Sequence, residues 1–118
     1  MEHGTFHNQL RNKIDEFVHL VYQLTKTFPK NELYGITSQL RRASLSVALN
    51  YIEGFARNKN KVYKNFLEIS YGSLQESKYL LEFSKKEGLI KELESNKVIK
   101  LADEIGAMLW GIISKIKI

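Results

Sequence analysis

The 118-residue chain has no cysteine, so disulfide bonds and thiolate metal sites are excluded. It has one proline, and its longest apolar stretch, 107–113, is far shorter than the ~20 residues that cross a bilayer. The first residues, MEHGTFHNQLRNK, lack the apolar run of a signal peptide. These absences predict a cytoplasmic protein that needs no cross-links and makes no membrane contact.

Histidine is also scarce, with only His3, His7 and His19. The Glu-x-x-His pairs of di-iron bundles are absent, and His3 and His7 lie at a terminus that we expect to fray. Some helical-bundle ribonucleases place an arginine a few residues before a histidine, but the nearest match, Arg11 and His19, has a longer gap. We therefore expect no metal, no cofactor and no catalysis, and keep a ribonuclease as the last alternative.

The remaining composition is that of an ordinary globular chain. Hydrophobic residues make up 43% and charged residues 26%, which is unlike a disordered sequence and enough to bury a core in one domain, 1–118. The net charge of +5 permits binding to a polyanion but does not require it.

Apolar residues recur at alternating intervals of four and three, which is the period of an amphipathic helix. Pro29 and Gly88 are natural helix stops, and Thr37 is a candidate N-cap. Short links between helical segments favour antiparallel neighbours. The pattern therefore predicts an all-α, antiparallel, up-down-up-down four-helix bundle. Its helices are expected over residues 8–27, 37–57, 61–86 and 93–116.

Two of the expected helices carry polar residues on their apolar stripes. The stripe of 37–57 contains Leu40, Ala43, Val47, Asn50 and Gly54. The stripe of 61–86 contains Phe66, Ile69, Ser73, Glu76, Leu80 and Phe83, with Gly72 beside it.

These residues predict a close contact between the two helices. Gly54 and Gly72 would let the backbones approach, and Asn50, Ser73 and Glu76 would form a polar cluster. A carboxylate in such a cluster needs a cation, for which Arg42 is the candidate. The cluster, which includes Glu53, is interpreted in three ways: a functional site, a network that fixes which helices meet, or part of a subunit interface.

Basic residues gather in two zones. One surrounds the second link and consists of Arg57, Lys59, Lys61 and Lys64, with Tyr63 among them. The other begins the second expected helix with Arg41, at the opposite end of an antiparallel bundle. Either zone is a candidate for sequence-independent binding to RNA or DNA; the alternative is a solvated link. Arg57 is also placed to pair with Glu53, four residues earlier.

Several motifs resemble one family. They begin with Phe28-Pro29 and Tyr34-Gly35 and continue with Thr37-x-Gln39-Leu40-Arg41-Arg42-Ala43, Ser46-Val47, Asn50-x-x-Glu53-Gly54 and Gly72-Ser73-Leu74-x-Glu76. In this order they resemble the 23S rRNA intervening-sequence protein family, which is related to the accessory proteins of diversity-generating retroelements. Tyr51 and Ile52 depart from that pattern, where Ile-Ala is usual, and predict a changed contact between helices or subunits.

The resemblance implies a four-helix bundle that assembles as a ring of five, binds nucleic acid through basic surfaces in some members, and has no established enzymatic activity. We therefore expect a homo-oligomer, with a pentamer favoured, that acts as a nucleic-acid-binding adaptor. The alternative is a protein–protein scaffold, because Leu109, Trp110 and Ile113 would widen the apolar surface of the last helix.

Overall fold

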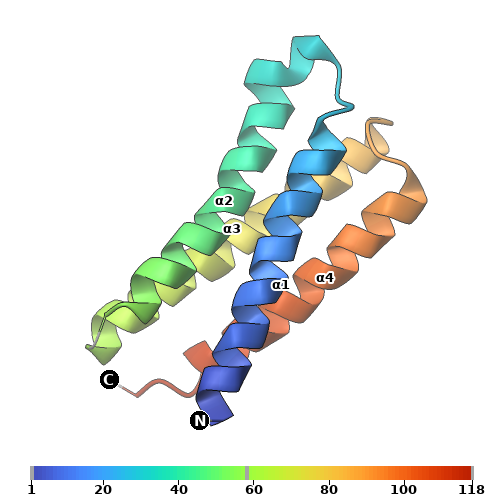
Figure 1. Ribbon diagram of the computed structural model, residues 1–118. Coiled ribbons are helices and arrows are strands. Elements are labelled where there is room, and N and C mark those ends of the chain that lie inside the picture. Colours follow the sequence, from blue (N-terminus) through green and yellow to red (C-terminus); the bar gives the residue numbers. More distant parts are fainter. Residues whose placement is uncertain (1, 58, 118) are drawn as a thin grey trace.

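The computed structural model describes residues 2–57 and 59–117, with side chains from residue 4 onward. Four helices dominate it: α1 (Glu2–Thr25), α2 (Ser38–Phe55), α3 (Asn60–Lys86) and α4 (Glu92–Ile113). Consecutive helices run in opposite directions, and α1 also packs on α4, which closes the bundle (Figure 1). The expected all-α four-helix bundle is confirmed, and no strand occurs in the part of the chain that the structure describes.

The link between α1 and α2 is formed by two short helical turns. It contains a 3₁₀ turn, Lys30–Glu32, and a wide π-type turn, Leu33–Thr37, with a kink at Gly35. Thr37 has helical dihedral angles and no capping hydrogen bond from its side chain, so its predicted role as N-cap is wrong. The preceding turn already supplies acceptors to the first amide groups of α2, as in the bond from Ser38 N to Gly35 O.

Gly88 ends α3 as predicted. Its φ of 77° lies in the left-handed region, which glycine adopts at little cost. Leu89 N donates to Ser84 O at 2.8 Å and Gly88 N donates to Lys85 O at 3.0 Å, which is the Schellman pattern.

Helix α1 buries residues at the expected intervals of four and three, and the stripe predicted for α3 is corrected. The buried residues at these intervals of α1 are Leu10, Ile14, Phe17 and Val21. Ile69 and Phe83 of the predicted α3 stripe are 43% and 42% exposed. The buried stripe is rotated by one residue and is lined by serines between leucines: Leu67, Ser70, Leu74, Ser77, Leu81 and Ser84. Serine hydroxyls bond to backbone carbonyls within the bundle, so these positions are buried although the sequence makes them look polar.

Small residues let α2 and α3 approach closely. A Cβ atom added to Gly54 would lie 2.8 Å from Phe66 Cβ, and Ser70 Oγ donates directly to Val47 O at 2.7 Å. Gly72 takes no part, because nothing lies within 4 Å of the position its Cβ would occupy. The predicted close approach is thus right for Gly54 and wrong for Gly72.

The apolar surface predicted for α4 is smaller than expected. Of the three residues predicted to widen it, Leu109 and Ile113 are buried in the core and Trp110 is exposed. Exposed apolar residues instead lie on the outer sides of α2 and α3, at Leu49, Ile52 and Ile69.

Candidate nucleic-acid interface

Three chain segments that contain lysine and arginine but no aspartate or glutamate meet at one end of the bundle. These segments, 3–14, 54–67 and 105–117, contain eight of the 18 Lys and Arg and none of the 13 Asp and Glu. The antiparallel topology gathers them at the end where the α2–α3 link and both termini lie (Figure 1). We call this region the basic end. The rest of the chain holds ten cations against 13 acids and is net negative.

The α2–α3 link supplies most of the basic end. Lys59 and Lys61 are exposed and Lys64 is half-buried. Arg57 pairs with Glu53 and lies 5.5 Å from the centre of the Phe66 ring, so its guanidinium is held beside the lysines. The predicted Arg57–Glu53 pair is present, with both side chains 48% exposed.

The C-terminal segment adds cations that are not among those predicted for this zone from the sequence. Asn60 Nδ2 donates to Lys117 O at 3.3 Å, which brings this segment against the start of α3. Lys115 and Lys117 are exposed there. The signal that could have found them is the absence of acids after Glu104, read together with the antiparallel order of the helices.

Aromatic groups fasten α1 to α2 within the basic end. Tyr51 is buried, and its hydroxyl lies 2.6 Å from His7 Nδ1. The His7 ring also contacts Phe55, with ring centres 4.4 Å apart. Burial raises the pKa of the Tyr51 phenol well above its usual value, and Tyr63 and Arg11 act on it less strongly in opposite directions. The change from the family pattern at Tyr51 thus creates a contact between helices. Burial also raises the pKa of Tyr63.

The predicted polar cluster lies in the groove between α2 and α3 rather than in the bundle centre. Ser46 and Ser73 share a hydrogen bond of 2.8 Å, and Asn50 Nδ2 donates to Ser46 O at 2.9 Å. Arg42 donates to Glu76 at 2.7 Å in an ion pair whose side chains are 60% and 45% exposed. The cluster was expected to be buried or half-buried; Glu76 is more exposed than that, and its expected pairing with Arg42 is present.

Arg41 lies outside the basic end and is occupied by contacts with α1. Its Nε donates to Thr25 Oγ1 at 2.8 Å, and its guanidinium carbon lies 4.7 Å from the centre of the Tyr22 ring. The structure therefore does not bring Arg41 together with the cations of the α2–α3 link.

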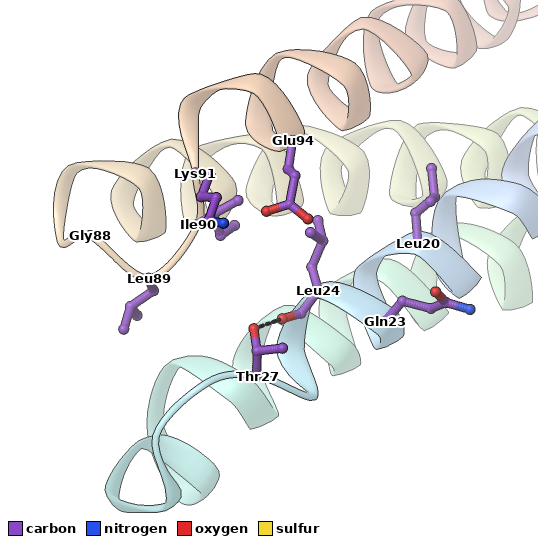
Figure 2. A pocket seen from close by; sticks show the side chains of 9 residues that line it. All are labelled: Leu20, Gln23, Leu24, Thr27, Gly88, Leu89, Ile90, Lys91 and Glu94. Atoms are coloured by element: carbon purple, nitrogen blue, oxygen red, sulfur yellow. Dashed lines mark hydrogen bonds between the residues drawn. The ribbon is translucent and has the colours of Figure 1, made fainter.

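Other clefts of the bundle have mixed linings. The groove in Figure 2 lies between the end of α1 and the α3–α4 link, and Glu94 points across it toward Leu24. In the described segments, no three His, Asp or Glu side chains lie close enough to hold a metal ion. Arg11 and His19 are both exposed on α1 and lie about 12 Å apart along its axis at 1.5 Å per residue. None of the helices described is long and apolar enough to span a membrane.

Comparisons with known proteins agree with this architecture. A family model described as 23S rRNA-intervening sequence protein matches residues 7–111. A solved structure from Bacteroides thetaiotaomicron VPI-5482, described as a protein with unknown function from the S23 ribosomal protein family, superimposes with a TM-score of 0.80. It shares 24% identity, over 88% of this chain and 97% of that chain, and so supports the fold alone. No curated protein matches the sequence.

Proposed function

The chain belongs to the 23S rRNA-intervening sequence protein family, and we propose that it is a non-catalytic, self-associating protein that binds RNA or DNA through its basic end. The observation that carries the proposal is the separation of charge along the bundle. Eight cations and no acid lie in the three segments that meet there, while the rest of the chain is net negative. The family description, which refers to an rRNA, supports RNA as the nucleic acid.

Binding of this kind depends on phosphate contacts. Lysine ammonium groups neutralise phosphates and release condensed counterions, which gives affinity without reading the sequence. Among the described residues, every long helix belongs to the bundle, and none is free to enter the major groove of a duplex. We therefore expect little discrimination between base sequences. The protein would act in the cytoplasm as an adaptor that holds a nucleic acid.

Self-association would place several copies of the basic end in one assembly, one from each subunit. The resemblance implies a ring of five, and the exposed apolar side chains on the outer faces of α2 and α3 provide a surface that such an assembly could bury. Several basic ends in one ring would bind one nucleic acid together, and each contact after the first would be intramolecular.

A salt titration tests the proposal. The purified protein should retard a structured RNA in ~50 mM salt, and log K should fall linearly with log salt at a slope of about −0.7 to −0.9 for each phosphate contacted. A light-scattering mass from the same preparation should show an oligomer. Absence of retardation at ~50 mM salt, where phosphate contacts are strong, would contradict nucleic-acid binding.

The second candidate function is a protein–protein scaffold with no nucleic-acid ligand. The observation that favours it is the exposed apolar surface of Leu49, Ile52 and Ile69. Charge reversal at Lys59, Lys61 and Lys64 separates the two functions. It should abolish RNA binding while the light-scattering mass stays the same; a scaffold would show no RNA binding before or after the change.

A further inference from the structure

A second cationic site lies at the end of the bundle opposite the basic end. A cleft of about 460 Å³ opens where the α1–α2 link meets the first turns of α2. Its charged lining consists of Arg41 and Arg42, with the side chains of Ser38 and Tyr22 beside them and no carboxylate. Each of the other four clefts described in the bundle includes at least one Asp or Glu. This cleft is therefore the one among them whose charge favours an anion.

Arg41 is held in place by bonds that leave most of its donors available. Nε donates to Thr25 Oγ1, and the guanidinium stacks on the Tyr22 ring. Nη1 and Nη2 have no hydrogen-bond partner among the described residues. A guanidinium that is already fixed loses little freedom when it binds an oxyanion, and its planar fork suits two oxygens at once.

Arg42 offers a second, more exposed group. Its bonds to Gln39 and Glu76 both use Nη2. An exposed ion pair of this kind is weak, so Glu76 competes poorly with a ligand of higher charge. The two arginines together favour a phosphate, which presents three oxygens and up to two negative charges.

Two further features point to a ligand. Thr37 is 3% exposed, lines the cleft, and has a hydroxyl with no hydrogen-bond partner among the described residues. A buried hydroxyl without a partner is costly, so an additional acceptor at this wall of the cleft would be stabilising. Tyr34, at 93% exposure, and Leu33 form an apolar rim on which a flat ring can stack.

We propose that this cleft binds a nucleoside phosphate, with the phosphate between Arg41 and Arg42 and the base against Tyr34. The ligand is either a free mononucleotide or the 5′-terminal nucleotide of an RNA. The site does not depend on the basic end, which lies at the other end of the molecule. It gives a role to the two arginines that nucleic-acid binding at the basic end leaves unused.

A matched pair of variants tests the site. Leu45→Glu places a carboxylate in the cleft lining, where it repels a phosphate and can itself pair with Arg41 or Arg42. Leu49→Glu makes the same change one turn further along α2, outside the cleft and at a more exposed position. In calorimetric titrations of the full chain with adenosine monophosphate, Leu45→Glu should weaken binding about tenfold or more, and Leu49→Glu less than about twofold.

Arg41→Lys provides an independent check. It keeps the positive charge and loses the fork, so the affinity should fall while the melting temperature stays within a few degrees of the unchanged protein. The proposal is overturned if adenosine monophosphate at ~5 mM gives no binding, a limit that still detects millimolar affinity. It is also overturned if Leu45→Glu and Leu49→Glu bind equally, or if binding disappears only on charge reversal at Lys59, Lys61 and Lys64.

A further experiment distinguishes a free mononucleotide from the 5′-terminal nucleotide of an RNA. It uses the variant in which the charges of Lys59, Lys61 and Lys64 are reversed, so that the basic end no longer binds RNA. A 5′-phosphorylated oligoribonucleotide that binds more tightly than both adenosine monophosphate and its own 5′-hydroxyl form identifies an RNA end. Equal affinity for the 5′-phosphorylated oligonucleotide and the mononucleotide identifies a free nucleotide.

Discussion

At both ends of the bundle, side chains of α1 and α2 contact each other, but the groups that make the contact differ. Each end fastens α1 to α2 near a link. At the basic end Tyr51 of α2 contacts His7 of α1, while at the opposite end the cation Arg41 of α2 contacts Thr25 and Tyr22 of α1. The arginine of the opposite end is therefore partly used for structure. Lys13 of the basic end also pairs with Glu104, whereas in the described segments no ion pair is present at Lys59, Lys61 or Lys64. Charge that is free of structural contacts is charge available for a ligand.

The two ends also differ in the balance of acidic and basic residues. The links at the opposite end, residues 26–37 and 85–94, hold five Lys and four Glu and are nearly balanced, and the net positive charge there comes mainly from Arg41 and Arg42 beside them. The three segments of the basic end hold eight cations and no acid, and two of these cations, Arg57 and Lys13, pair with the flanking Glu53 and Glu104. A surface with balanced charge attracts polyanions weakly, whereas one with an excess of positive charge attracts them over a Debye length of about 8–10 Å.

The largest effect should come from reversing charge at one end at a time. We expect Lys59→Glu, Lys61→Glu and Lys64→Glu together to reduce RNA affinity about 100-fold or more at ~50 mM salt, because lysine contacts to phosphate become repulsive. The matched control reverses the exposed Lys26, Lys30 and Lys91 at the opposite end and should change affinity less than about threefold. Fluorescence anisotropy with a labelled RNA measures both. Equal losses would mean that net charge, and not its placement, decides binding.

Packing between α2 and α3 should be more sensitive at the basic end than at mid-helix. Gly54→Ala should lower the free energy of unfolding by about 1–3 kcal/mol, because the added methyl group overlaps Phe66. Gly72→Ala meets open space and should raise it by up to about 1 kcal/mol through helix propensity. Urea unfolding gives both values. A destabilising Gly72→Ala would mean that α3 packs against something at that position, such as a second subunit.

The Tyr51–His7 contact and the Arg41–Thr25 contact should respond differently to alkaline pH. Because the pKa of Tyr51 is higher in the folded chain than in the unfolded chain, the folded state is favoured below the unfolded value near 10 and loses that advantage as pH rises above it. Tyr51→Phe should cost about 1 kcal/mol at pH 7 and make the loss of stability above pH ~10 shallower.

Thr25→Val provides the comparison at the opposite end. It removes the hydroxyl that Arg41 binds, and since arginine does not titrate in this range, its cost should be the same at pH 7 and pH ~10.5. Denaturant unfolding at the two pH values measures both variants. A pH profile unchanged by Tyr51→Phe would show that other groups cause the alkaline loss.

The smallest effect should come from the exposed pair of Arg42 and Glu76. Glu76→Gln removes the charge and keeps the shape, and for a pair this exposed we expect a change of less than about 1 kcal/mol in the free energy of unfolding. The same substitution should leave RNA binding at the basic end unchanged. A larger loss of stability would indicate that the pair is covered in an assembly.

The helices were predictable because their signals are local. The stripe from Leu10 to Phe28 has one apolar face, and Gly88 ends α3 by a conformation that only glycine adopts easily. The α3 stripe was predicted one residue out of position because serines occupy its buried side. Serine looks polar in a sequence, but its hydroxyl is satisfied by the backbone of the same helix or its neighbour, as Ser70 is by Val47.

The candidate site was predictable only in part, for a related reason. Arg57, Lys59, Lys61 and Lys64 are close in sequence, so their cluster needs no knowledge of the fold. Lys117 joins them through a contact between residues 57 positions apart, and Arg41 is separated from them because it contacts α1 at the opposite end. Such contacts depend on which helices become neighbours and how each is rotated.

By itself the sequence determined the number of helices, their links, the absence of disulfides and the basic character of the second link, because these follow from local periodicity and residue type. Only the tertiary structure decided that the three acid-free segments share one end, that Tyr51 joins α1 to α2, and that Arg41 and Arg42 open onto one cleft. The physical reason is that an antiparallel bundle brings together residues far apart in the chain, and the rotation of each helix decides which side chains meet.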